Sequence, residues 1–467
     1  MPLTEADLNQ IPEWGIDPKN PGKYHTLLAD LQGNILKGHG REHSVHLFIQ
    51  WKPERIEEAK QWIADFAENY VTSAQQQADE AIAYREKGVC GQIFGNLFLT
   101  RFGYEALGFP PFQVPQDQPF TMGMKNEQIR GFLGDPPLGS WEAGFREKIH
   151  GLILIADDNL NELLQAVNRL SVKLRQIAVI LHREDGFVLR NDKGQAIEHF
   201  GFVDGVSQPL YLKRDIERAK CKDGNFNRWD PRAALANILV KDINGKTEDS
   251  YGSYLVYRKF EQNVKLFRDD QRRLAQKLEI HEDLAGAMVM GRFHDGTPVT
   301  ESAVATSPIA IKNNFNFEQD IAASKCPFHA HIRKINPRGD TGRVESSPGF
   351  EEALSIERSH RIARRAVSYG NNDPTQEPET DAGLLFLCFQ ANIENQFNFM
   401  QSRWANADRF VKVGVGSDPV IGQPEKAQKW PKQWGHSETE DYLFKTWVQM
   451  KGGEYFFAPS ISFLSNL

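Results

Sequence analysis

Cysteine is scarce in this chain, and its few cysteines show no pairing pattern. They are scattered over 467 residues without a Cys-x-x-Cys pair: Cys90, Cys221, Cys326 and Cys388. A disulfide framework or a structural zinc site would bring cysteines into short, recurring spacings. The sequence therefore indicates neither kind of site.

Long hydrophobic runs and an excess of positive charge are also missing. The longest apolar runs, such as 152–156 and 384–389, have the length of a strand and are too short to span a bilayer. Residues 1–7 show no basic region followed by an apolar run, so no signal peptide is expected. The net charge of -7 argues against nucleic acid or an anionic membrane surface as the main partner. These absences predict a cytoplasmic protein that binds neither nucleic acid nor a membrane surface.

Core-forming residues, by contrast, are plentiful. With 40% hydrophobic residues over 467 positions, the chain can build two packed domains. Between Tyr211 and Ser250 the composition becomes polar and charged, which is the clearest candidate boundary. We therefore predict an N-terminal domain over 1–212, a connecting segment over 213–249 and a C-terminal domain over 250–467.

Both halves mix strands and helices in a similar order. In the first half, strands are expected at 45–51, 93–100, 150–156 and 177–181, with one helix after Pro53 and another after Asp158. In the second half, strands are expected at 251–258, 329–333, 363–369, 383–390 and 455–461, and helices at 262–278, 284–290 and 393–405. This order predicts an α+β protein with two ferredoxin-like domains. The long segment 109–139, rich in proline and glycine, is expected to be an irregular lid or insertion.

The segment Cys326–Arg338 combines histidines with basic residues. His329 and His331 are two residues apart, and Arg333, Lys334 and Arg338 follow. In an extended segment both imidazoles would point to one face and could address one buried group. A haem fits, because imidazole is a common iron ligand and arginine pairs well with propionate carboxylates. The alternative is a hydrogen-bonded histidine in the core.

A second segment, 201–209, reads Gly-Phe-Val-Asp-Gly-Val-Ser-Gln-Pro. Glycines on both sides of Asp204 indicate a tightly turned backbone that holds one short carboxylate in place. The alternative is a turn in which Asp204 bonds its own backbone.

Two further segments carry candidate residues. At 361–370, Arg364 and Arg365 begin a predicted strand, so one of them should turn inward while the other faces solvent. At 383–390, Leu384 and Phe386 share a face and could wall an apolar pocket. The alternatives are a charged edge strand and an ordinary core strand.

Together these segments resemble the dye-decolourising (DyP-type) peroxidases, a family of haem enzymes. The resemblance includes Gly-x-x-Asp-Gly with Ser-Gln-Pro at 201–209, His-Ile-Arg-Lys-x-Asn-Pro-Arg at 331–338, Arg-Arg…Tyr-Gly at 364–370 and Gly-Leu-Leu-Phe at 383–386. It extends in the family's order from Leu-Gln-Gly-Asn-Ile-Leu-Lys-Gly near the start to the closing Gly-Gly-Glu-Tyr-Phe-Phe-Ala-Pro. The fold it implies is two ferredoxin-like domains of the dimeric α+β barrel type, with the haem held mainly by the second.

The resemblance also implies roles for single residues. His331 is similar to the proximal iron ligand, and His329 falls outside the family motif. Asp204 resembles the distal acid–base group and Arg364 the distal arginine. The remaining implied haem contacts are Arg338 with a propionate, Leu384 and Phe386 as pocket walls, and Glu394 as acceptor of the second imidazole N–H of His331. Position 366 is Ala, where some relatives carry Asn and others Gly.

The activity implied is that of a haem b peroxidase. It would reduce hydrogen peroxide through a ferryl intermediate and oxidise organic reductants such as dyes and phenols, as a homo-oligomer. Two other hypotheses remain open at this point: a haem carrier or sensor of the same architecture, and a haem-free ferredoxin-like binding module. A carrier would need His331 but no distal acid, so the presence of Asp204 and Arg364 favours the enzyme.

Overall fold

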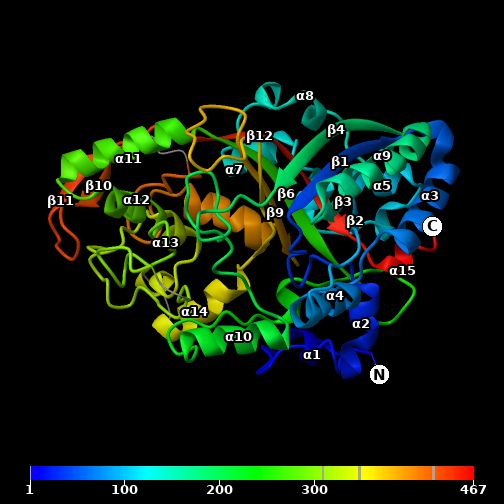
Figure 1. The fold of residues 1–467 in the computed structure, drawn as a ribbon, viewed down its shortest axis with the longest axis horizontal. Coiled ribbons are helices and arrows are strands. Elements are labelled where there is room, and N and C mark those ends of the chain that lie inside the picture. The colour runs from blue at the N-terminus through cyan, green and yellow to red at the C-terminus, as the bar shows by residue number, and fades with distance from the viewer. Residues whose placement is uncertain (1, 308–309, 345–348, 423–425) are drawn as a thin grey trace.

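Strands from both halves of the chain lie in one sheet. In the computed structural model, which describes residues 2–307, 310–344, 349–422 and 426–467, ten strands follow the order β5-β6-β12-β2-β3-β1-β4-β8-β9-β7. A further pairing of β6 with β9 closes the sheet on itself. Figure 1 shows this barrel in the right half of the molecule.

The first half contributes a four-stranded unit in the order β2-β3-β1-β4. Its helix α9 lies across β1, β3 and β4 and contacts α3. The strands are antiparallel, so this is the ferredoxin-like arrangement. The bounds are β1 (His43–Trp51), β2 (Phe94–Leu99), β3 (Gly151–Asp157), β4 (Ala178–Phe187), α3 (Ile56–Asn69) and α9 (Leu160–Ile177).

The second half repeats that order as β12-β6-β9-β8, with β7 beside β8 on the same edge of β9. The two units join where β12 meets β2, at Phe457 and Leu99, and where β4 meets β8, at Phe187 and Ser368. The predicted fold, two ferredoxin-like units of the dimeric α+β barrel type, is confirmed, and the two units share one closed sheet. The bounds are β6 (Tyr251–Gln262), β7 (Ala363–Arg364), β8 (Val367–Tyr369), β9 (Gly383–Gln390) and β12 (Val448–Ala458).

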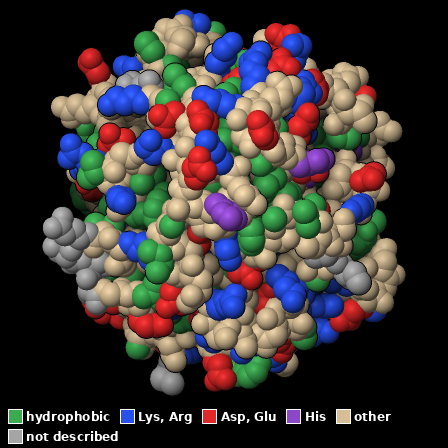
Figure 2. Space-filling view, turned by 90° about the vertical axis from the view of Figure 1, so that its left-hand side faces the viewer, with side chains coloured by type: hydrophobic (Ala, Val, Ile, Leu, Met, Phe, Trp, Pro, Cys, Tyr) green, Lys and Arg blue, Asp and Glu red, His purple; other side chains and the backbone are tan. Residues whose placement is uncertain are grey.

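A second core lies beside the barrel, on the left of Figure 1. Helices α11 and α12 pack together there, and α12 contacts α13. The face of the molecule on this side carries interspersed acidic, basic and hydrophobic side chains (Figure 2). The elements are α11 (Val264–Leu278), α12 (Glu282–Met290), α13 (His331–Ile335), α14 (Phe350–Ser359), β10 (Gln428–Pro431) and β11 (Thr439–Tyr442).

The spacing of apolar residues predicts which face of a long helix is buried, but not the residue at which the helix begins. In α9, Leu163, Val167 and Leu170 are buried as the helical spacing predicts, but the helix is capped by Asn159, whose side chain accepts from the backbone N–H groups of Asn161 and Glu162. The helix therefore begins where it was expected, directly after Asp158, with Asn159 as its cap.

Three sequence expectations need correction. The predicted strand at 329–333 is instead the start of helix α13, so His329 and His331 do not share the face of an extended segment. The segment 393–405 is helical as predicted, but it is wound as π-helix over Glu394–Asn398 and Met400–Ala405. The segment 109–139, expected to be irregular, contains α6 (Gln118–Met122) and α7 (Glu127–Leu133).

The segment 213–249 is not a plain connector, because it contains α10 (Lys213–Asp223) and β5 (Val240–Lys241). The domain limits stay a prediction. Within the described ranges, no helix is both long and apolar enough to cross a membrane. The other helices are α1 (Glu5–Asn9), α2 (His25–Asp30), α4 (Ala74–Lys87), α5 (Arg101–Ala106), α8 (Ala143–Arg146) and α15 (Ile461–Leu464).

Candidate active site

A large cavity brings together residues from α13, the 201–209 loop and the outer face of the barrel. It has about 1690 Å³ of space free of protein atoms, part of it open to solvent. Five of the candidate residues line it: Asp204, His331, Arg364, Leu384 and Phe386. Apolar side chains make up much of the remaining wall, including Ile332, Ile335, Phe397, Met400, Trp404 and Val420.

His331 is the first residue of α13, and its imidazole is held by Asp418. Nδ1 of His331 lies 2.7 Å from Oδ2 of Asp418, whose side chain is fully buried. The other carboxylate oxygen of Asp418 accepts from the backbone N–H groups of Val420 and Ile421, at 2.7 and 3.2 Å. Because a carboxylate accepts, Nδ1 is the donor, and Nε2 is the nitrogen left for the cavity.

This geometry corrects the expectation for Glu394. Glu394 is exposed at the start of its π-helix and does not line the cavity, so Asp418 takes the place beside His331 that was predicted for it. Asp418 is 87 positions from His331, and a lone Asp in a turn-rich segment gives no local spacing from which the pair could be predicted.

Asp204 and Arg364 meet at the cavity wall. Nη1 of Arg364 lies 3.2 Å from Oδ1 of Asp204, and both side chains are about one-quarter exposed, at 25% and 26%. Gly201 and Gly205 have φ angles of +91° and +73°, in the region that favours glycine. The backbone N–H of Gly205 also donates to Oδ1 of Asp204 at 2.6 Å. Asp204 therefore bonds its own turn, as the simpler interpretation held, and faces the cavity as well.

The two neighbouring arginines differ in their roles. The backbone N–H of Arg364 donates to Oε1 of Gln208 at 3.0 Å, which ties the 201–209 loop to β7. Arg365 donates to the carbonyl oxygens of Asn34 and Ile35, both at 2.7 Å. The expectation that one arginine faces solvent was wrong, because Arg365 instead anchors the family-like segment near the start of the chain.

Arg338 lies behind the cavity wall instead of in it. Its side chain is fully buried between the rings of Trp229 and Phe315, at 4.2 and 3.9 Å. It donates to the carbonyl oxygens of Asn313 and Phe315 and to the side chains of Asn313 and Ser207. These bonds do not support direct pairing with a propionate. The arginines in the wall are Arg292, Arg361 and Arg364.

His329 belongs to the second core and does not line the cavity. It is buried edge-on against Trp430, with ring centres 4.3 Å apart. Burial lowers the pKa of His329 to about 3, so its ring is neutral.

The residues of the cavity fit a haem. One imidazole nitrogen is available to iron, apolar side chains are present for the faces of a porphyrin, and Arg292 and Arg361 offer positive charge for its carboxylates. Successive residues of β9 point to opposite faces of the sheet. Leu384 and Phe386 line the cavity, whereas Leu385 and Leu387 are buried in the barrel core.

Comparisons with known proteins show which family the chain belongs to. The family model "DyP dimeric alpha+beta barrel domain" matches residues 30–188, and "Dyp-type peroxidase, C-terminal" matches residues 213–413. The multifunctional dye peroxidase DyP2 of Amycolatopsis sp. is 38% identical, covering 96% of this chain and 97% of its own. The chain belongs to the DyP-type peroxidase family.

Solved DyP-type peroxidases show the same fold. The crystal structure of the DyP-type peroxidase AnaPX from Anabaena sp. is 65% identical, covers 99% of both chains and superposes with a TM-score of 0.98. A dye-decolorizing peroxidase solved in complex with 2,6-dimethoxyphenol is 26% identical, covers 94% of this chain and 98% of its own, and has a TM-score of 0.76. The protein is thus a hydrogen-peroxide-dependent oxidoreductase of a haem peroxidase family, which sets aside the haem-free binding module.

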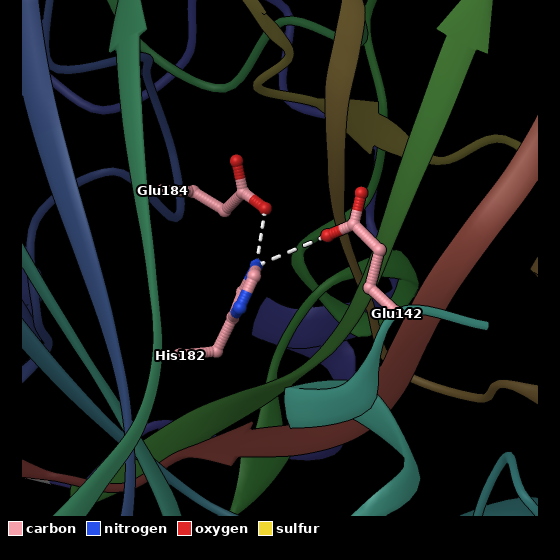
Figure 3. Close-up of side chains that lie close together, drawn as sticks. All are labelled: Glu142, His182 and Glu184. Carbon is pink, nitrogen blue, oxygen red and sulfur yellow. Dashed lines mark hydrogen bonds and ion pairs between the residues drawn. The ribbon is translucent and has the colours of Figure 1, made fainter. Parts of the chain in front are cut away.

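A second titratable cluster lies in the barrel, away from the cavity wall. Figure 3 shows the ring of His182 between the carboxylates of Glu142 and Glu184; the Glu142 oxygen is 3.3 Å from Nε2. Lys259 of β6 bridges the same two carboxylates at 2.9 and 2.7 Å. Because Lys259 and His182 already balance both negative charges, the cluster is a salt-bridge network and gives no reason to infer a metal ion.

This network predicts a pH-dependent stability. Burial alone would lower the pKa of His182, but its hydrogen bonds to Glu142 and Glu184 outweigh burial and raise the pKa from 6.5 to about 9. The folded state therefore binds the His182 proton more tightly than the unfolded state does. The resulting stabilisation is fully present below pH 6.5 and is lost as the pH rises to about 9. The loss should be about 3 kcal/mol in the free energy of unfolding, measured by urea denaturation at each pH. The variant His182→Gln should lack this step, and an identical pH slope in both proteins would contradict the prediction.

Proposed function

We propose that the chain is a haem b peroxidase in which His331 is the iron ligand, Asp204 moves the proton of peroxide and Arg364 stabilises the developing charge. The observation that carries this proposal is that His331, whose imidazole is held by Asp418, lines the same cavity as the Asp204–Arg364 pair. His331 would hold the iron of a bound haem, and the haem would supply the redox chemistry for the reduction of peroxide.

The distal pair would carry out the proton transfer. The carboxylate of Asp204 accepts a proton from one peroxide oxygen and returns it to the other, which leaves as water. One oxygen of Asp204 is fixed by the N–H of Gly205, so its other oxygen is available for this proton. Arg364, at 3.2 Å from Asp204, is close enough to stabilise negative charge on the departing oxygen.

The proximal pair would tune the ligand. Asp418 accepts the Nδ1–H bond of His331 and is itself fixed by two backbone N–H groups. This fixes the tautomer and orientation of the imidazole and makes its Nε2 a stronger electron donor.

On the cavity wall, Leu384 and Phe386 would keep bulky reductants away from the space where peroxide reacts.

The reductants we propose are dyes and phenols, in keeping with the names of the relatives and with the dimethoxyphenol complex of one of them. A homo-oligomeric state and a cytoplasmic location stay predictions. A haem carrier or sensor is the second candidate function, but haem binding alone would not require the Asp204–Arg364 pair.

An absorption spectrum of haem-reconstituted protein, before and after one equivalent of peroxide, tests the proposal. A ferric Soret band should appear on reconstitution and shift within a second of adding peroxide, then return on addition of a phenol. A Soret band that is stable to peroxide, or that only bleaches, would favour the carrier. Failure to form a Soret band would contradict haem binding itself.

A further inference from the structure

The two sequence segments that meet at the cavity are also joined behind its wall. Asp204 and His331 both line the cavity, but they belong to segments that are remote in the chain. Arg338 ends the segment that begins with His331, and its Nη2 donates to Oγ of Ser207 at 2.9 Å. Ser207 belongs to the same loop as Asp204. A single buried side chain therefore connects the loop of the distal carboxylate with the segment of the candidate iron ligand.

Asn313 strengthens this connection from a third part of the chain. Its Oδ1 accepts from Nη2 of Arg338 at 2.6 Å and from Oγ of Ser207 at 2.9 Å. Its Nδ2 donates to the carbonyl oxygen of Val206 at 3.3 Å, and its own carbonyl oxygen accepts from Nη1 of Arg338 at 2.7 Å. Arg338 and Asn313 thus form a hydrogen-bonded bridge to two adjacent residues of the loop.

The bridge is buried, and its backbone is held in an uncommon conformation. Arg338 and Asn313 are 0% and 7% exposed and lie behind the residues that line the cavity. The φ angle of Arg338 is +47°, in the left-handed region that favours glycine. Such a conformation persists where the surrounding structure requires it, and it occurs often at functional sites. Because water is excluded and the donor is charged, these hydrogen bonds are strong and the bridge is stiff.

This arrangement explains why an arginine is useful at position 338 although its guanidinium does not line the cavity. We propose that Arg338 and Asn313 are positioning residues, which hold the loop of Asp204 at a fixed place relative to the segment of His331. The inference rests on the proposed function for the roles of Asp204 and His331, and it adds what keeps the two apart by the right distance. Proton transfer requires groups within hydrogen-bond reach, so a small displacement of the loop slows it strongly.

Two substitutions at one position separate the bridge from the general packing of this region. Asn313→Ala removes the side-chain bonds to Arg338, Ser207 and Val206. Asn313→Asp keeps an oxygen that accepts from Arg338 and Ser207, and it gives up only the longer bond to Val206. The conservative variant should therefore restore what Asn313→Ala loses.

Asn316→Ala is the matched control. It changes the same residue type in the same part of the chain, and it also removes hydrogen bonds. The side chain of Asn316 donates to the carbonyl oxygen of Arg228 at 3.3 Å and accepts from the backbone N–H of Glu318 at 3.2 Å. Neither partner belongs to the two segments that the bridge connects.

Cyanide binding to the ferric, haem-reconstituted protein tests the positioning of Asp204 without turnover. Hydrogen cyanide must give up its proton before the anion binds iron, so the rate of binding depends on the distal carboxylate. We expect the association rate constant to fall about tenfold in Asn313→Ala, the scale of a displaced catalytic group, and to be that of the wild type in Asn313→Asp and Asn316→Ala. In an Asp204→Asn background, Asn313→Ala should have no further effect, because the group that it positions is already lost.

Hydrogen–deuterium exchange of the full chain, before haem is added, tests the bridge itself. Ser207→Ala changes only the loop, yet it should speed exchange in 331–338 about tenfold, the scale of one lost hydrogen bond to a charged group. Asn313→Ala should speed exchange in both 201–209 and 331–338, whereas Asn316→Ala should leave both unchanged. If Asn313→Ala fails to fold, Ser207→Ala still decides the question.

Three results would overturn the proposal. The first is unchanged exchange in 331–338 when Ser207 is replaced by Ala. The second is a wild-type rate of cyanide binding in folded Asn313→Ala. The third is an equal slowing by Asn313→Ala with and without Asp204→Asn, which would mean that the substitution acts on the cavity in general. Failure to bind haem would instead count against the proposed function, while the exchange measurement would still report on the bridge.

Discussion

Asp204→Asn should slow the reaction of the haem with peroxide by about two orders of magnitude or more, the usual scale for a lost acid–base group. Asn keeps the shape of the side chain and its bond from the N–H of Gly205, but it cannot take up the peroxide proton. Haem content and the ferric Soret band should stay as in the wild type, since Asp204 contributes to the wall and not to the iron ligand. Stopped-flow absorption with peroxide in excess measures the rate.

The same experiment separates the two distal residues. A near-normal rate in Asp204→Asn would transfer the acid–base role to Arg364 or to water. A slow rate together with a changed Soret band would instead show that the substitution disturbed the cavity. Only a slow reaction with an unchanged ferric spectrum supports the proton-transfer role.

His331→Ala should lose haem, and His329→Ala should keep it. The loss in affinity should exceed the roughly 10–100-fold that follows removal of a supporting partner of a metal ligand, because here the ligand itself is removed. Soret absorbance per protein after reconstitution and gel filtration measures the retained haem. His329 is a well-matched control, because it is two positions away and buried in the second core, outside the cavity.

The control variant His329→Ala should lower stability without loss of haem. His329→Ala removes packing against Trp430, so its unfolding midpoint should fall although its Soret band remains. The reverse pattern of haem retention in the two variants would mean that the wrong histidine was assigned to the iron.

Local patterns in the sequence predicted most of the barrel strands, because alternation and apolar runs report directly on burial. Strand β9, for example, has the predicted limits, Gly383–Gln390. Helix α13 was mistaken for a strand, because five residues are too few to show a helical period. The closure of the sheet was predicted from the resemblance to the family and not from local patterns, since the seams depend on Phe457 beside Leu99 and Phe187 beside Ser368, pairs that are remote in the chain.

The cavity residues divide in the same way. Asp204, His331 and Arg364 stand in compact motifs, and the structure brings them to one cavity. Asp418 was missed because only the folded chain brings it to His331. The resemblance implied a propionate partner for Arg338, but in the fold Arg338 donates to the carbonyl oxygens of Asn313 and Phe315 and to the side chain of Asn313, between two aromatic rings.

The closed sheet also constrains how the chain can fold. Strand β12 lies between β6 and β2, so neither ferredoxin-like unit alone has all its strand edges covered, and a fragment that ends before Val448 leaves two of them open. Open edges recruit other strands and favour aggregation. Because Phe457 pairs with Leu99 across most of the chain, we expect ring closure to be a slow step of folding. We expect the two halves to be soluble together and to precipitate when produced apart.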